Sequence, residues 1–469
     1  MNVTVIGTGY VGTVTGACLA YLGHRVWCVD TDGAKIEKLR AGQSPIFEPG
    51  LEDLMRVCTE RGLLEFETDL TEPVRQSDVI FVAVGTPPLP SGESNLTYVE
   101  AAARAIGSAM DSSRFRVVVN KSTVPIGSGN LVGTLVREGI SAAGGQHVRF
   151  GMASNPEFLR EGSAIHDSLY PDRIVVGTEE PETLAVMRAL YAELAAQQFP
   201  DPSFEPRPLG TGTVPVVETT LTSAEMIKYS ANAFLATKIG FANEMSNICE
   251  RVGADITEVM RGIGLDSRIG TKFLNAGIGW GGSCFGKDIG SLLHTAGEYG
   301  YQASLLEATL QVNQRQRLLV IQKLQEKLFI LKGRTIGLLG LSFKPNTDDL
   351  RDAPSLRIAE RLIQMGARVR AYDPIAMDAC REQHPELRIL YCNDALSMAE
   401  HADALVLVTE WPEFGTLDLR ELAGRMDHAV LIDGRNMFDA ARANAAGFDY
   451  TGMGRAPHRT PAPTSTTAN

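Results

Sequence analysis

Short apolar runs rich in β-branched residues alternate with helically spaced segments along the first ~200 residues. The runs read VTVIG, RVWCVD, DVIFVAVGTP and RVVVNKST, and the segment VGTVTGACLAYLG after the first run has helical spacing. Runs that alternate in this way are typical of a parallel β-sheet covered by helices. This part of the chain is therefore predicted to be an α/β domain.

A second alternating block starts at RTIGLLGLSFK and continues through SLRIAERLIQMG, ARVRAYDP, ADALVLVTEW and HAVLIDGRN. The order strand, turn, helix, strand ending in Asp occurs at 3–30 and again at 335–373. This is a repeat of architecture and not a short solenoid period. We therefore expect an α/β fold with two Rossmann-like doubly wound domains.

Between the two blocks, the Pro- and Gly-rich segment 198–217 is predicted to be a loop or linker. It is followed by a long helical pattern at 223–253, and a second one covers 307–328. The predicted regions are 1–205, a central helical and dimerisation region at 206–325 that carries Cys284, 326–455, and a disordered Pro/Thr/Ala-rich tail at 456–469. The two α/β domains are expected to be joined by the long central helix.

The bulk composition narrows the class of protein. A chain of 469 residues is too long for one core, and its net charge of −12 with no basic stripe argues against a nucleic-acid surface. The seven cysteines show no CxxC spacing, which favours reduced thiols and disfavours disulfides and zinc. No apolar run approaches the ~18 residues of a membrane span, and the start MNVTVIG lacks a basic signal-peptide region. We expect a cytoplasmic protein without a metal, a membrane or a nucleic-acid partner.

A dinucleotide site is predicted at the first strand-to-helix turn. VIGTGYVG places Gly7, Gly9 and Gly12 in G-x-G-x-x-G spacing, and the next strand ends in Asp30. The glycines let the backbone approach a pyrophosphate at the helix N-terminus, and Asp30 can accept hydrogen bonds from the adenosine ribose. An acidic group there repels a 2′-phosphate, so NAD is favoured over NADP, with Lys35 as a feature that argues the other way. The second block lacks the three glycines and should hold something other than a dinucleotide pyrophosphate.

A cysteine on a glycine-rich turn is the most unusual feature of the chain. GWGGSCFGKD places Cys284 after a run of glycines and just before Lys287 and Asp288. Glycines beside a reactive side chain indicate close approach of backbone or ligand, but a turn with an incidental cysteine has the same pattern. These ten residues alone leave both interpretations open.

Further polar residues occupy positions that simple packing does not explain. Thr123 stands at a strand end, and the motif NPEFLREG gathers Glu157, Arg160 and Glu161 around an apolar pair. Lys228 and Asn232 are four residues apart and share one face of the long helix. Each also has an ordinary structural explanation: a solvated lysine, a helix-capping glutamate pair, or a buried asparagine that bridges backbone groups.

Taken together, these segments resemble the UDP-glucose/GDP-mannose dehydrogenase family. The blocks GTGYVG, KSTVPIG, NPEFLREG, SAEMIKYSANAF, RIGTKFLNAGIGWGGSCFGKD, GLSFKPNTDDLRDAPS and DGRN follow the family order over about residues 1–450. The resemblance implies NAD on the first domain and the UDP moiety held partly by the second. It also implies a four-electron oxidation of an alcohol to a carboxylate that consumes two NAD and one water.

The resemblance also implies roles for individual residues. Oxidation only to an aldehyde needs no nucleophile, whereas continuing to an acid does, and a Cys284 thiolate would supply it. Lys228 and Asn232 would stabilise the oxyanion, Asp288 and Thr123 would orient water or take the alcohol proton, and Glu157 would act as general base. Expected cofactor-binding residues are Gly7, Gly9, Tyr10, Val11, Gly12, Asp30, Lys35, Thr86, Thr123, Glu161, Lys287 and Arg351. Expected substrate-binding residues are Glu157, Phe158, Leu159, Arg160, Glu161, Lys228, Asn232, Arg268, Phe273, Leu274, Asn275, Gly281, Lys344 and Arg435.

The resemblance favours UDP-glucose as the substrate, with GDP-mannose as the alternative. Arg268 is expected to reach the substrate of a partner subunit, which implies a homodimer. Two other hypotheses stay open: a two-electron hydroxyacid-type dehydrogenase, which would not need Cys284, and a nucleotide-sugar sensor that is not an enzyme. A sensor would be expected to have lost Cys284, Lys228 or Asp288, and all are present.

Overall fold

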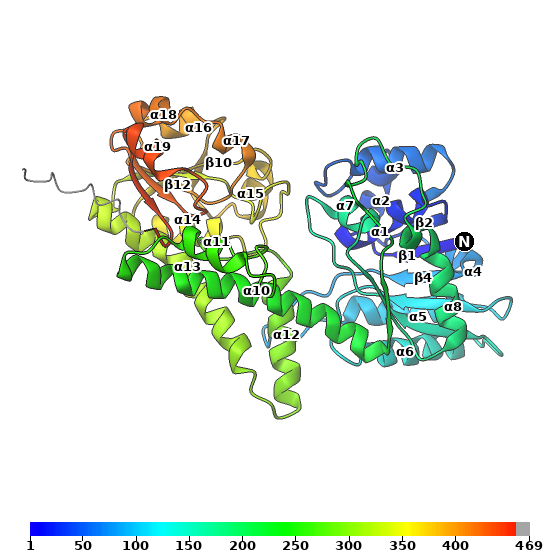
Figure 1. Cartoon of the computed structure of the whole chain (residues 1–469). Helices are drawn as coiled ribbons and strands as arrows, with labels where there is room; N and C mark the ends of the chain where they lie inside the picture. Colours follow the sequence, from blue (N-terminus) through cyan, green and yellow to red (C-terminus); the bar gives the residue numbers. More distant parts are fainter. Residues whose placement is uncertain (456–469) are drawn as a thin grey trace, which may run out of the picture. The chain divides into compact units, whose positions relative to one another are not determined.

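The computed structural model describes residues 1–455, which form two compact units (Figure 1). Unit 1 comprises 1–232 with 287–302, and unit 2 comprises 233–286 with 303–455. The helices of the predicted region 206–325 are thus divided between the units. The predicted tail, 456–469, lies outside the described residues.

Unit 1 is built on an eight-stranded sheet in the order β3-β2-β1-β4-β5-β6-β7-β8. Its strands are β1 (Asn2–Ile6), β2 (Arg25–Val29), β3 (Leu64–Glu67), β4 (Val79–Val82), β5 (Arg116–Asn120), β6 (Phe150–Ser154), β7 (Ile174–Gly177) and β8 (Val216–Thr219). Its helices are α1 (Tyr10–Tyr21), α2 (Gly33–Arg40), α3 (Leu51–Glu60), α4 (Thr71–Gln76), α5 (Thr97–Ala109), α6 (Ser128–Ala142), α7 (Ala164–Leu169), α8 (Pro181–Leu190) and α9 (Ala192–Ala196).

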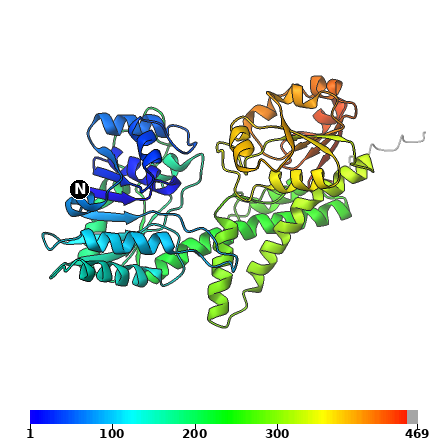
Figure 2. The same cartoon turned by 180° about the vertical axis from the view of Figure 1, so that it is seen from behind.

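Helices cover both faces of this sheet because its strands are apolar on both sides. In β5, Val117 and Val119 join the core that includes α1, α3 and α7, whereas Val118 joins the core beneath α5 and α6. Figures 1 and 2 show α5 and α6 side by side on that second face. The prediction of a helix-covered sheet is therefore confirmed.

Two details of unit 1 differ from the expected parallel sheet and linker. β6 and β7 pair antiparallel, so β7 and β8 run against the other strands. The segment 198–217 does not remain a loop to its end, because Val216 and Val217 belong to β8, which pairs with β7 at the sheet edge. The Pro-rich stretch hides this strand, since its short apolar run has no alternating pattern.

Unit 2 contains a parallel six-stranded sheet in the order β11-β10-β9-β12-β13-β14. Its strands are β9 (Thr335–Leu339), β10 (Arg368–Tyr372), β11 (Ile389–Tyr391), β12 (Ala404–Leu407), β13 (Val430–Asp433) and β14 (Asp449–Gly452). Its helices are α11 (Ile256–Gly264), α13 (Ser304–Leu328), α14 (Pro354–Gln364), α15 (Met377–Gln383), α16 (Ala395–Ala399), α17 (Pro412–Gly415), α18 (Leu419–Arg425) and α19 (Ala440–Ala445).

Two helices have residues in both units: α10 (Leu221–Val252), 32 residues long, and α12 (Phe285–Glu298). Within unit 2, α10 and α13 run side by side (Figures 1 and 2), and Lys323 of α13 pairs with Glu250 of α10 at 2.6 Å. The fold class predicted from the sequence, two Rossmann-like doubly wound domains and a long central helix, is confirmed.

Candidate functional site

The turn between β1 and α1 leaves space for a ligand at only one of its three glycines. A Cβ on Gly7 (φ +99°) would lie 2.7 Å from the carbonyl oxygen of Ala83, and a Cβ on Gly12 would lie 1.8 Å from that of Gly7. A Cβ on Gly9 would meet nothing within 4 Å. Gly7 and Gly12 therefore pack the turn closely, while Gly9 opens it at the N-terminus of α1, where free N–H groups favour a phosphate.

Asp30 closes the dinucleotide turn from the end of β2. Its Oδ2 accepts hydrogen bonds from the Thr8 backbone N–H at 2.9 Å and hydroxyl at 2.8 Å, and from Lys35 Nζ at 3.1 Å. Partial burial works against the charged form, but these donors hold the pKa of Asp30 below its usual value. Lys35 is thus engaged with Asp30, and the turn fits NAD because it offers an anion cradle beside an ionised carboxylate able to accept hydrogen bonds from a ribose.

The equivalent turn of unit 2 is filled by protein. Gly340 (φ +95°) donates to the Tyr372 carbonyl at 2.8 Å, as Gly7 donates to Val29 at 2.8 Å in unit 1. Asp373 occupies the place of Asp30, but it is fully buried and accepts the indole N–H of Trp411 at 3.1 Å. Because Trp411 covers this carboxylate, no ribose can reach it. The repeat found in the sequence is structural, and only unit 1 retains the dinucleotide site.

Tyr10 connects the dinucleotide turn to the segment that carries Arg160 and Glu161. Its hydroxyl donates to the buried Glu48 carboxylate, which also accepts the backbone N–H groups of Gly162 at 2.6 Å and Ala164 at 2.7 Å. Burial raises the pKa of Glu48, although the N–H donors oppose this shift. Glu48 therefore connects the cofactor turn to the end of the NPEFLREG motif, residues 160–162. The sequence analysis missed this role because Glu48 lies in no recognised motif.

A buried ion pair joins two of the predicted catalytic residues. Lys228 Nζ lies 2.7 Å from Glu157 Oε1, and both side chains are less than a tenth exposed. The other Glu157 oxygen accepts the Leu159 backbone N–H at 2.9 Å. Phe158 lies between Glu157 and Leu159 in the chain. The centroid of its ring is 3.6 Å from the guanidinium carbon of Arg173 and 5.5 Å from Lys228 Nζ.

A second polar pair lies where α10 meets α12 within unit 1. The Asn232 amide donates to Asp288 Oδ2 at 2.6 Å, and Lys287 Nζ lies 2.6 Å from Asp288 Oδ1. Asp288 is 1% exposed, so its carboxylate is held in place by these two donors. The predicted residues Glu157, Lys228, Asn232, Lys287 and Asp288 are therefore paired within unit 1.

Lys121 and Asn155 support the Glu157 segment and were not among the predicted site residues. Lys121 Nζ donates to Asn155 Oδ1 at 3.0 Å, and the same oxygen accepts the Tyr191 hydroxyl at 2.6 Å. Both side chains line a cavity of about 80 Å³ behind Glu157 and Phe158. Burial lowers the pKa of Lys121 to about 8, against the opposing effect of Glu157. Both residues stand inside recognised motifs, KSTVPIG and NPEFLREG, which was the available signal.

Thr123 lies beyond the end of β5 in a turn held from two sides. Its carbonyl accepts the hydroxyl of Thr86, a predicted cofactor-binding residue, at 2.8 Å. Glu225 on α10 then accepts the backbone N–H groups of Gly127 at 2.6 Å and Gly129 at 2.8 Å, at the start of α6. Glu225 thus attaches the Thr123 turn to the helix of Lys228.

Cys284 is the exposed cysteine of the chain; five of the other six are buried and Cys392 is half-buried. It immediately precedes the first residue of α12, and the Ser283 hydroxyl lies 3.5 Å from its sulfur. A thiol at a helix N-terminus is stabilised as thiolate by the helix dipole. The position therefore favours a reactive sulfur over a packing one.

The glycines before Cys284 are required by the closeness of the surrounding chain. A Cβ on Gly281 would lie 2.5 Å from the Asp352 carbonyl oxygen, and one on Gly277 would lie 2.6 Å from that of Gly434. Gly279 (φ +91°) and Gly282 (φ +88°) adopt left-handed conformations. Packing within unit 2 thus explains these glycines without a ligand.

The predicted substrate-binding residues of unit 2, and the predicted cofactor-binding residue Arg351, stand in or beside strained backbone. Phe273 itself (φ 62°), Asn346 near Lys344, Asp352 after Arg351 and Asn436 after Arg435 have left-handed conformations. Such conformations in residues other than glycine concentrate at functional sites. Arg435 donates to the Gly279 carbonyl at 2.9 Å, Lys344 lies over the Phe343 ring at 5.4 Å, Arg351 pairs with Asp349 at 2.7 Å, Leu274 is buried and Asn275 is exposed.

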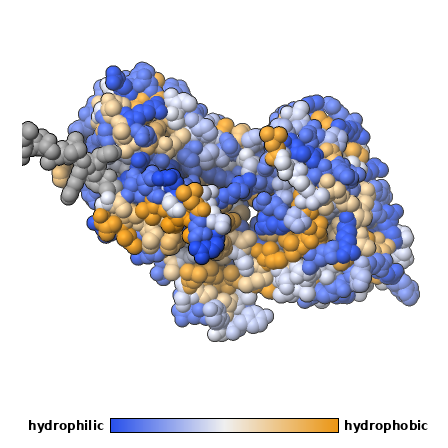
Figure 3. Space-filling view, viewed as in Figure 1, coloured by the Kyte–Doolittle hydropathy of each residue, from blue (hydrophilic) through white to orange (hydrophobic). Residues whose placement is uncertain are grey.

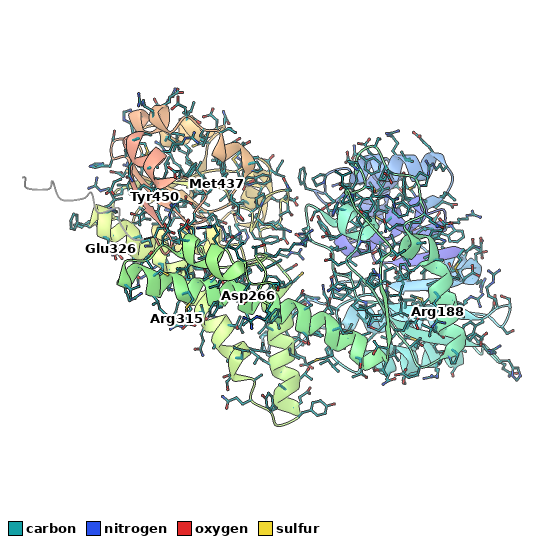
Figure 4. All side chains as sticks on the ribbon, in the orientation of Figure 1. Arg188, Asp266, Arg315, Glu326, Met437 and Tyr450 are labelled. Atoms are coloured by element: carbon teal, nitrogen blue, oxygen red, sulfur yellow. The ribbon has the colours of Figure 1, made fainter. Side chains whose placement is uncertain are left out.

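Two predicted substrate-binding arginines are exposed and held by nearby carboxylates. Arg160 pairs with Asp167 through Nε at 2.9 Å and Nη2 at 2.6 Å. Arg268 is 87% exposed and pairs with Asp266, labelled in Figure 4, at 2.6 Å. Each arginine would have to exchange this partner, in whole or in part, to bind a substrate phosphate or sugar.

Within residues 1–455, no helix is long and apolar enough to cross a membrane. The same residues contain no group of three or more His, Cys, Asp or Glu side chains arranged to hold a metal ion.

These features define an NAD-binding α/β protein with a second Rossmann-like unit that has lost its dinucleotide site. Models of the UDP-glucose/GDP-mannose dehydrogenase family match in order: the NAD binding domain over 1–195, the central domain over 222–315 and the UDP binding domain over 337–440. The chain belongs to this family, as the sequence resemblance predicted, and the prediction of NAD as cofactor is confirmed.

Individual relatives agree with this assignment. The chain is 46% identical to UDP-glucose 6-dehydrogenase TuaD of Bacillus subtilis over 97% of its own length and 93% of that protein. A UDP-glucose dehydrogenase structure from Pyrobaculum islandicum superposes with a TM-score of 0.86 at 38% identity, covering 97% and 98% of the chains. A GDP-mannose dehydrogenase from Pseudomonas aeruginosa gives a TM-score of 0.52 at 32% identity, covering 97% and 100%.

Proposed function

We propose that the protein oxidises UDP-glucose at C6 to UDP-glucuronate through a covalent intermediate on Cys284, and so supplies uronate for polysaccharide synthesis. The observation that carries the proposal is the setting of Cys284: an exposed thiol at the start of α12, on a glycine segment enclosed by unit 2. A two-electron dehydrogenase has no use for such a thiol. The relatives named for UDP-glucose support the substrate.

The overall reaction balances as R–CH₂OH + 2 NAD⁺ + H₂O → R–COO⁻ + 2 NADH + 3 H⁺, in which each NAD accepts one hydride. After the first oxidation, the Cys284 sulfur forms a bond to the aldehyde carbon and gives a thiohemiacetal. Loss of the second hydride leaves a thioester. Water then adds to the thioester carbon, and the C–S bond breaks to release the carboxylate and the thiol.

The polar pairs of unit 1 suit the proton transfers and the oxyanions of this sequence. Lys228 would supply a buried ammonium to stabilise a developing oxyanion, and its partner Glu157 is a carboxylate able to take a proton from water. Asn232 is an N–H donor to the oxyanion, and Thr123 and Asp288 orient the alcohol or water. Gly7, Gly9, Tyr10, Val11, Gly12, Asp30, Lys35, Thr86, Thr123, Glu161, Lys287 and Arg351 would hold the cofactor.

In unit 2, we propose that Lys344 and Arg435 bind the UDP-sugar together with Phe273, Leu274, Asn275 and Gly281. A basic side chain from each of two loops matches a diphosphate. Phe158, Leu159, Arg160 and Glu161 would contribute from unit 1. We propose the same three domain roles that the sequence suggested: NAD binding at 1–205, dimerisation and the nucleophile at 206–325, and UDP-sugar binding at 326–455.

GDP-mannose is the second candidate substrate, because a GDP-mannose dehydrogenase shares 32% identity with the chain. The test offers UDP-glucose, GDP-mannose and UDP-N-acetylmannosamine separately at equal concentration with excess NAD. UDP-glucose should give the highest kcat/KM and two NADH per sugar. A preference for GDP-mannose would change the substrate, and one NADH per sugar would refute the four-electron reaction.

The matched test of the nucleophile compares Cys284→Ala with Cys392→Ala. Removal of Cys284 should lower carboxylate formation by ~10³-fold or more, as is typical of essential nucleophiles, with NAD binding retained. Removal of the half-buried Cys392 should leave the rate unchanged. Near-normal carboxylate formation by Cys284→Ala would refute the covalent mechanism.

We also propose that the protein is a homodimer through α10. Phe234, Phe241 and Ile248 recur at seven-residue intervals on this helix and are 65%, 47% and 48% exposed. Seven-residue spacing keeps side chains on one helix face, and a surface of this length on a monomer is costly to leave in water. Figure 3 shows apolar surface over the part of unit 2 where α10 runs in Figure 1.

A second copy fits this stripe because the same residues on two antiparallel helices cover each other, as a two-fold interface requires. Phe241→Asp should convert the protein to a monomer in sedimentation analysis, whereas Phe329→Asp, a change at the exposed residue that follows α13, should not. If Arg268 contacts the substrate bound by the partner subunit, Arg268→Ala should lower the activity of the dimer. A monomeric unmodified protein would refute the dimer.

A cytoplasmic location remains our expectation, consistent with the absence of disulfides among the seven cysteines.

A further inference from the structure

We infer that Arg317 and Asp352 clamp the segment 276–282 and are positioning residues for the Cys284 thiol. The inference rests on the proposed role of Cys284 as nucleophile. All the residues involved belong to unit 2. Neither Arg317 nor Asp352 was a predicted site residue, although Asp352 lies in the recognised block GLSFKPNTDDLRDAPS; Arg317 lies in a helical segment outside the recognised blocks.

Arg317 joins three parts of unit 2. From α13, its Nη1 and Nη2 contact the two carboxylate oxygens of Asp352 at 2.6 and 2.7 Å. The same Nη2 also donates to the Trp280 carbonyl at 2.6 Å. Arg317 is 8% exposed, whereas the Asp352 side chain is 46% exposed. The guanidinium is therefore buried, and its two-point contact fixes the orientation of the partly exposed carboxylate.

The backbone of the segment is held by side chains and by the backbone of neighbouring turns. The Asn313 side chain binds both backbone polar groups of Trp280, accepting its backbone N–H at 2.8 Å and donating to its carbonyl at 3.0 Å. The remaining contacts are Gly277 N–H to Asn243 at 2.8 Å, Gln316 to the Gly277 carbonyl at 2.7 Å, Ile278 N–H to the Gly434 carbonyl at 2.9 Å, and Gly282 N–H to the Arg351 carbonyl at 2.9 Å. In this frame, Arg317 and Asp352 form the ion pair.

The clamp reaches both ends of the turn that carries the thiol. The Trp280 ring packs edge-on against the Phe285 ring, with centroids 5.7 Å apart and an interplanar angle of 86°. Phe285 directly follows Cys284, and Gly282, two residues before it, donates its N–H to the carbonyl of Arg351, the neighbour of Asp352, at 2.9 Å. Fixing Trp280 and Asp352 therefore restrains the residues before and after Cys284, which a thiol needs in order to meet an aldehyde carbon at bonding distance.

The chain permits a test of the charge pair that leaves the backbone unchanged. Asp352 has a left-handed conformation (φ 50°), which asparagine also adopts readily, so Asp352→Asn removes the charge without new backbone strain. Arg317→Lys keeps the charge but loses the two-point geometry. Arg317→Met removes both.

Two control variants lie on the same helix. Lys323 is as buried as Arg317, and its ion pair, at 2.6 Å, is made with Glu250 of α10, so Lys323→Met removes a comparable ion pair outside the clamp. Arg315, labelled in Figure 4, is exposed, so Arg315→Met removes an arginine from the solvent face. Melting temperatures of all variants measure the loss of stability separately from the loss of activity.

The assay measures kcat, KM for UDP-glucose and NAD, and NADH formed per sugar, with a carbonyl trap present to capture free aldehyde. Arg317→Met and Asp352→Asn should lower kcat by ~10- to 100-fold with KM within about threefold, because displacement of a reacting group by about 1 Å costs up to that factor. NADH per sugar should fall below two as aldehyde escapes capture. Arg317→Lys should recover part of kcat, and the two controls should keep the stoichiometry of the unmodified protein.

Equal losses of kcat in Arg317→Met and Lys323→Met at equal melting temperature, with two NADH per sugar in both, would overturn the clamp. Carboxylate formation by Cys284→Ala would instead overturn the proposed function, whatever the clamp variants do. The two failures are thus separate. If Arg317→Met does not fold, Asp352→Asn and Arg317→Lys decide the question by the same measurements.

Discussion

Replacing Gly281 by alanine tests whether tight packing behind the thiol turn is necessary. The added Cβ would lie 2.5 Å from the Asp352 carbonyl oxygen, 2.9 Å from Pro354 Cδ and 3.1 Å from Phe343 Cβ. Since an ordinary carbon–oxygen contact is about 3.3 Å, the turn or the Asp352 backbone must move by roughly 0.8 Å. Overpacking of this kind costs ~1–3 kcal/mol, and a shift of this size near a reacting group costs up to ~10²-fold in rate.

Gly286 provides the matched control on the other side of Cys284. A Cβ there would lie 3.7 Å from the Trp280 ring and 3.9 Å from Asp352, which are ordinary contacts, and the residue lies in α12. Gly286→Ala should therefore keep activity and raise the unfolding free energy by up to ~1 kcal/mol through helix propensity.

The measurements are thermal unfolding and steady-state NADH production for both variants. Gly281→Ala should melt a few degrees lower and lose most of its kcat, whereas Gly286→Ala should do neither. If Gly281→Ala retains both its melting temperature and its kcat, the packing of unit 2 against this turn is wrong. If both variants lose activity equally, the glycines have a role other than close approach.

Three more outcomes follow from single contacts. Asp30→Ser should lower kcat/KM for NAD by ~10-fold or more and narrow the gap to NADP, because Lys35 is released from its 3.1 Å pair; equal use of NAD and NADP by the unmodified protein would contradict this. In Glu225→Gln, the single amide oxygen can accept only one of the two backbone N–H groups that Glu225 holds at 2.6 and 2.8 Å, so the free energy of unfolding in urea should fall by ~1–3 kcal/mol. The control Glu179→Gln, which alters a contact of 3.4 Å to the Leu221 N–H, should lower it less. Burial lowers the pKa of Lys121 from 10.5 in the unfolded chain to about 8 in the folded protein, so between these pH values the unfolded chain binds more protons and stability should rise with pH. Lys121→Met should lack this rise. The reasoning would be refuted if the urea midpoint changed between pH 7.5 and 9.5 by the same amount in the variant and the unmodified protein.

The sequence by itself determined the features that depend on local chemistry. The three glycines and Asp30 lie within one strand–helix–strand unit, and the spacing of 23 residues between the first glycine and the aspartate is enough to predict that they form one dinucleotide site. The two sheets were predictable for the same reason, because buried parallel strands are continuous apolar runs. The family assignment followed from motifs that each occupy a few adjacent residues.

Only the tertiary structure decided which polar side chains meet. Arg317 and Asp352 are 35 residues apart, Lys121 and Asn155 are 34 apart, and Trp411 reaches Asp373 from 38 residues away. No periodicity links such pairs, because their contact depends on how a loop returns to a helix or a strand end. The same cause hid β8, which is held by pairing with β7 and has little strand pattern of its own.

Around Cys284, the sequence determined one part of the picture and the tertiary structure decided the other. The sequence showed a thiol among glycines and left open whether the glycines make room for a ligand or for the protein. The structure shows that Gly277 and Gly281 face backbone carbonyls of unit 2 at 2.6 and 2.5 Å from their absent Cβ atoms, whereas Gly9 of the dinucleotide turn faces open space. A glycine has the same letter in both places, and only the distance to the neighbouring chain separates a packing requirement from a ligand cradle.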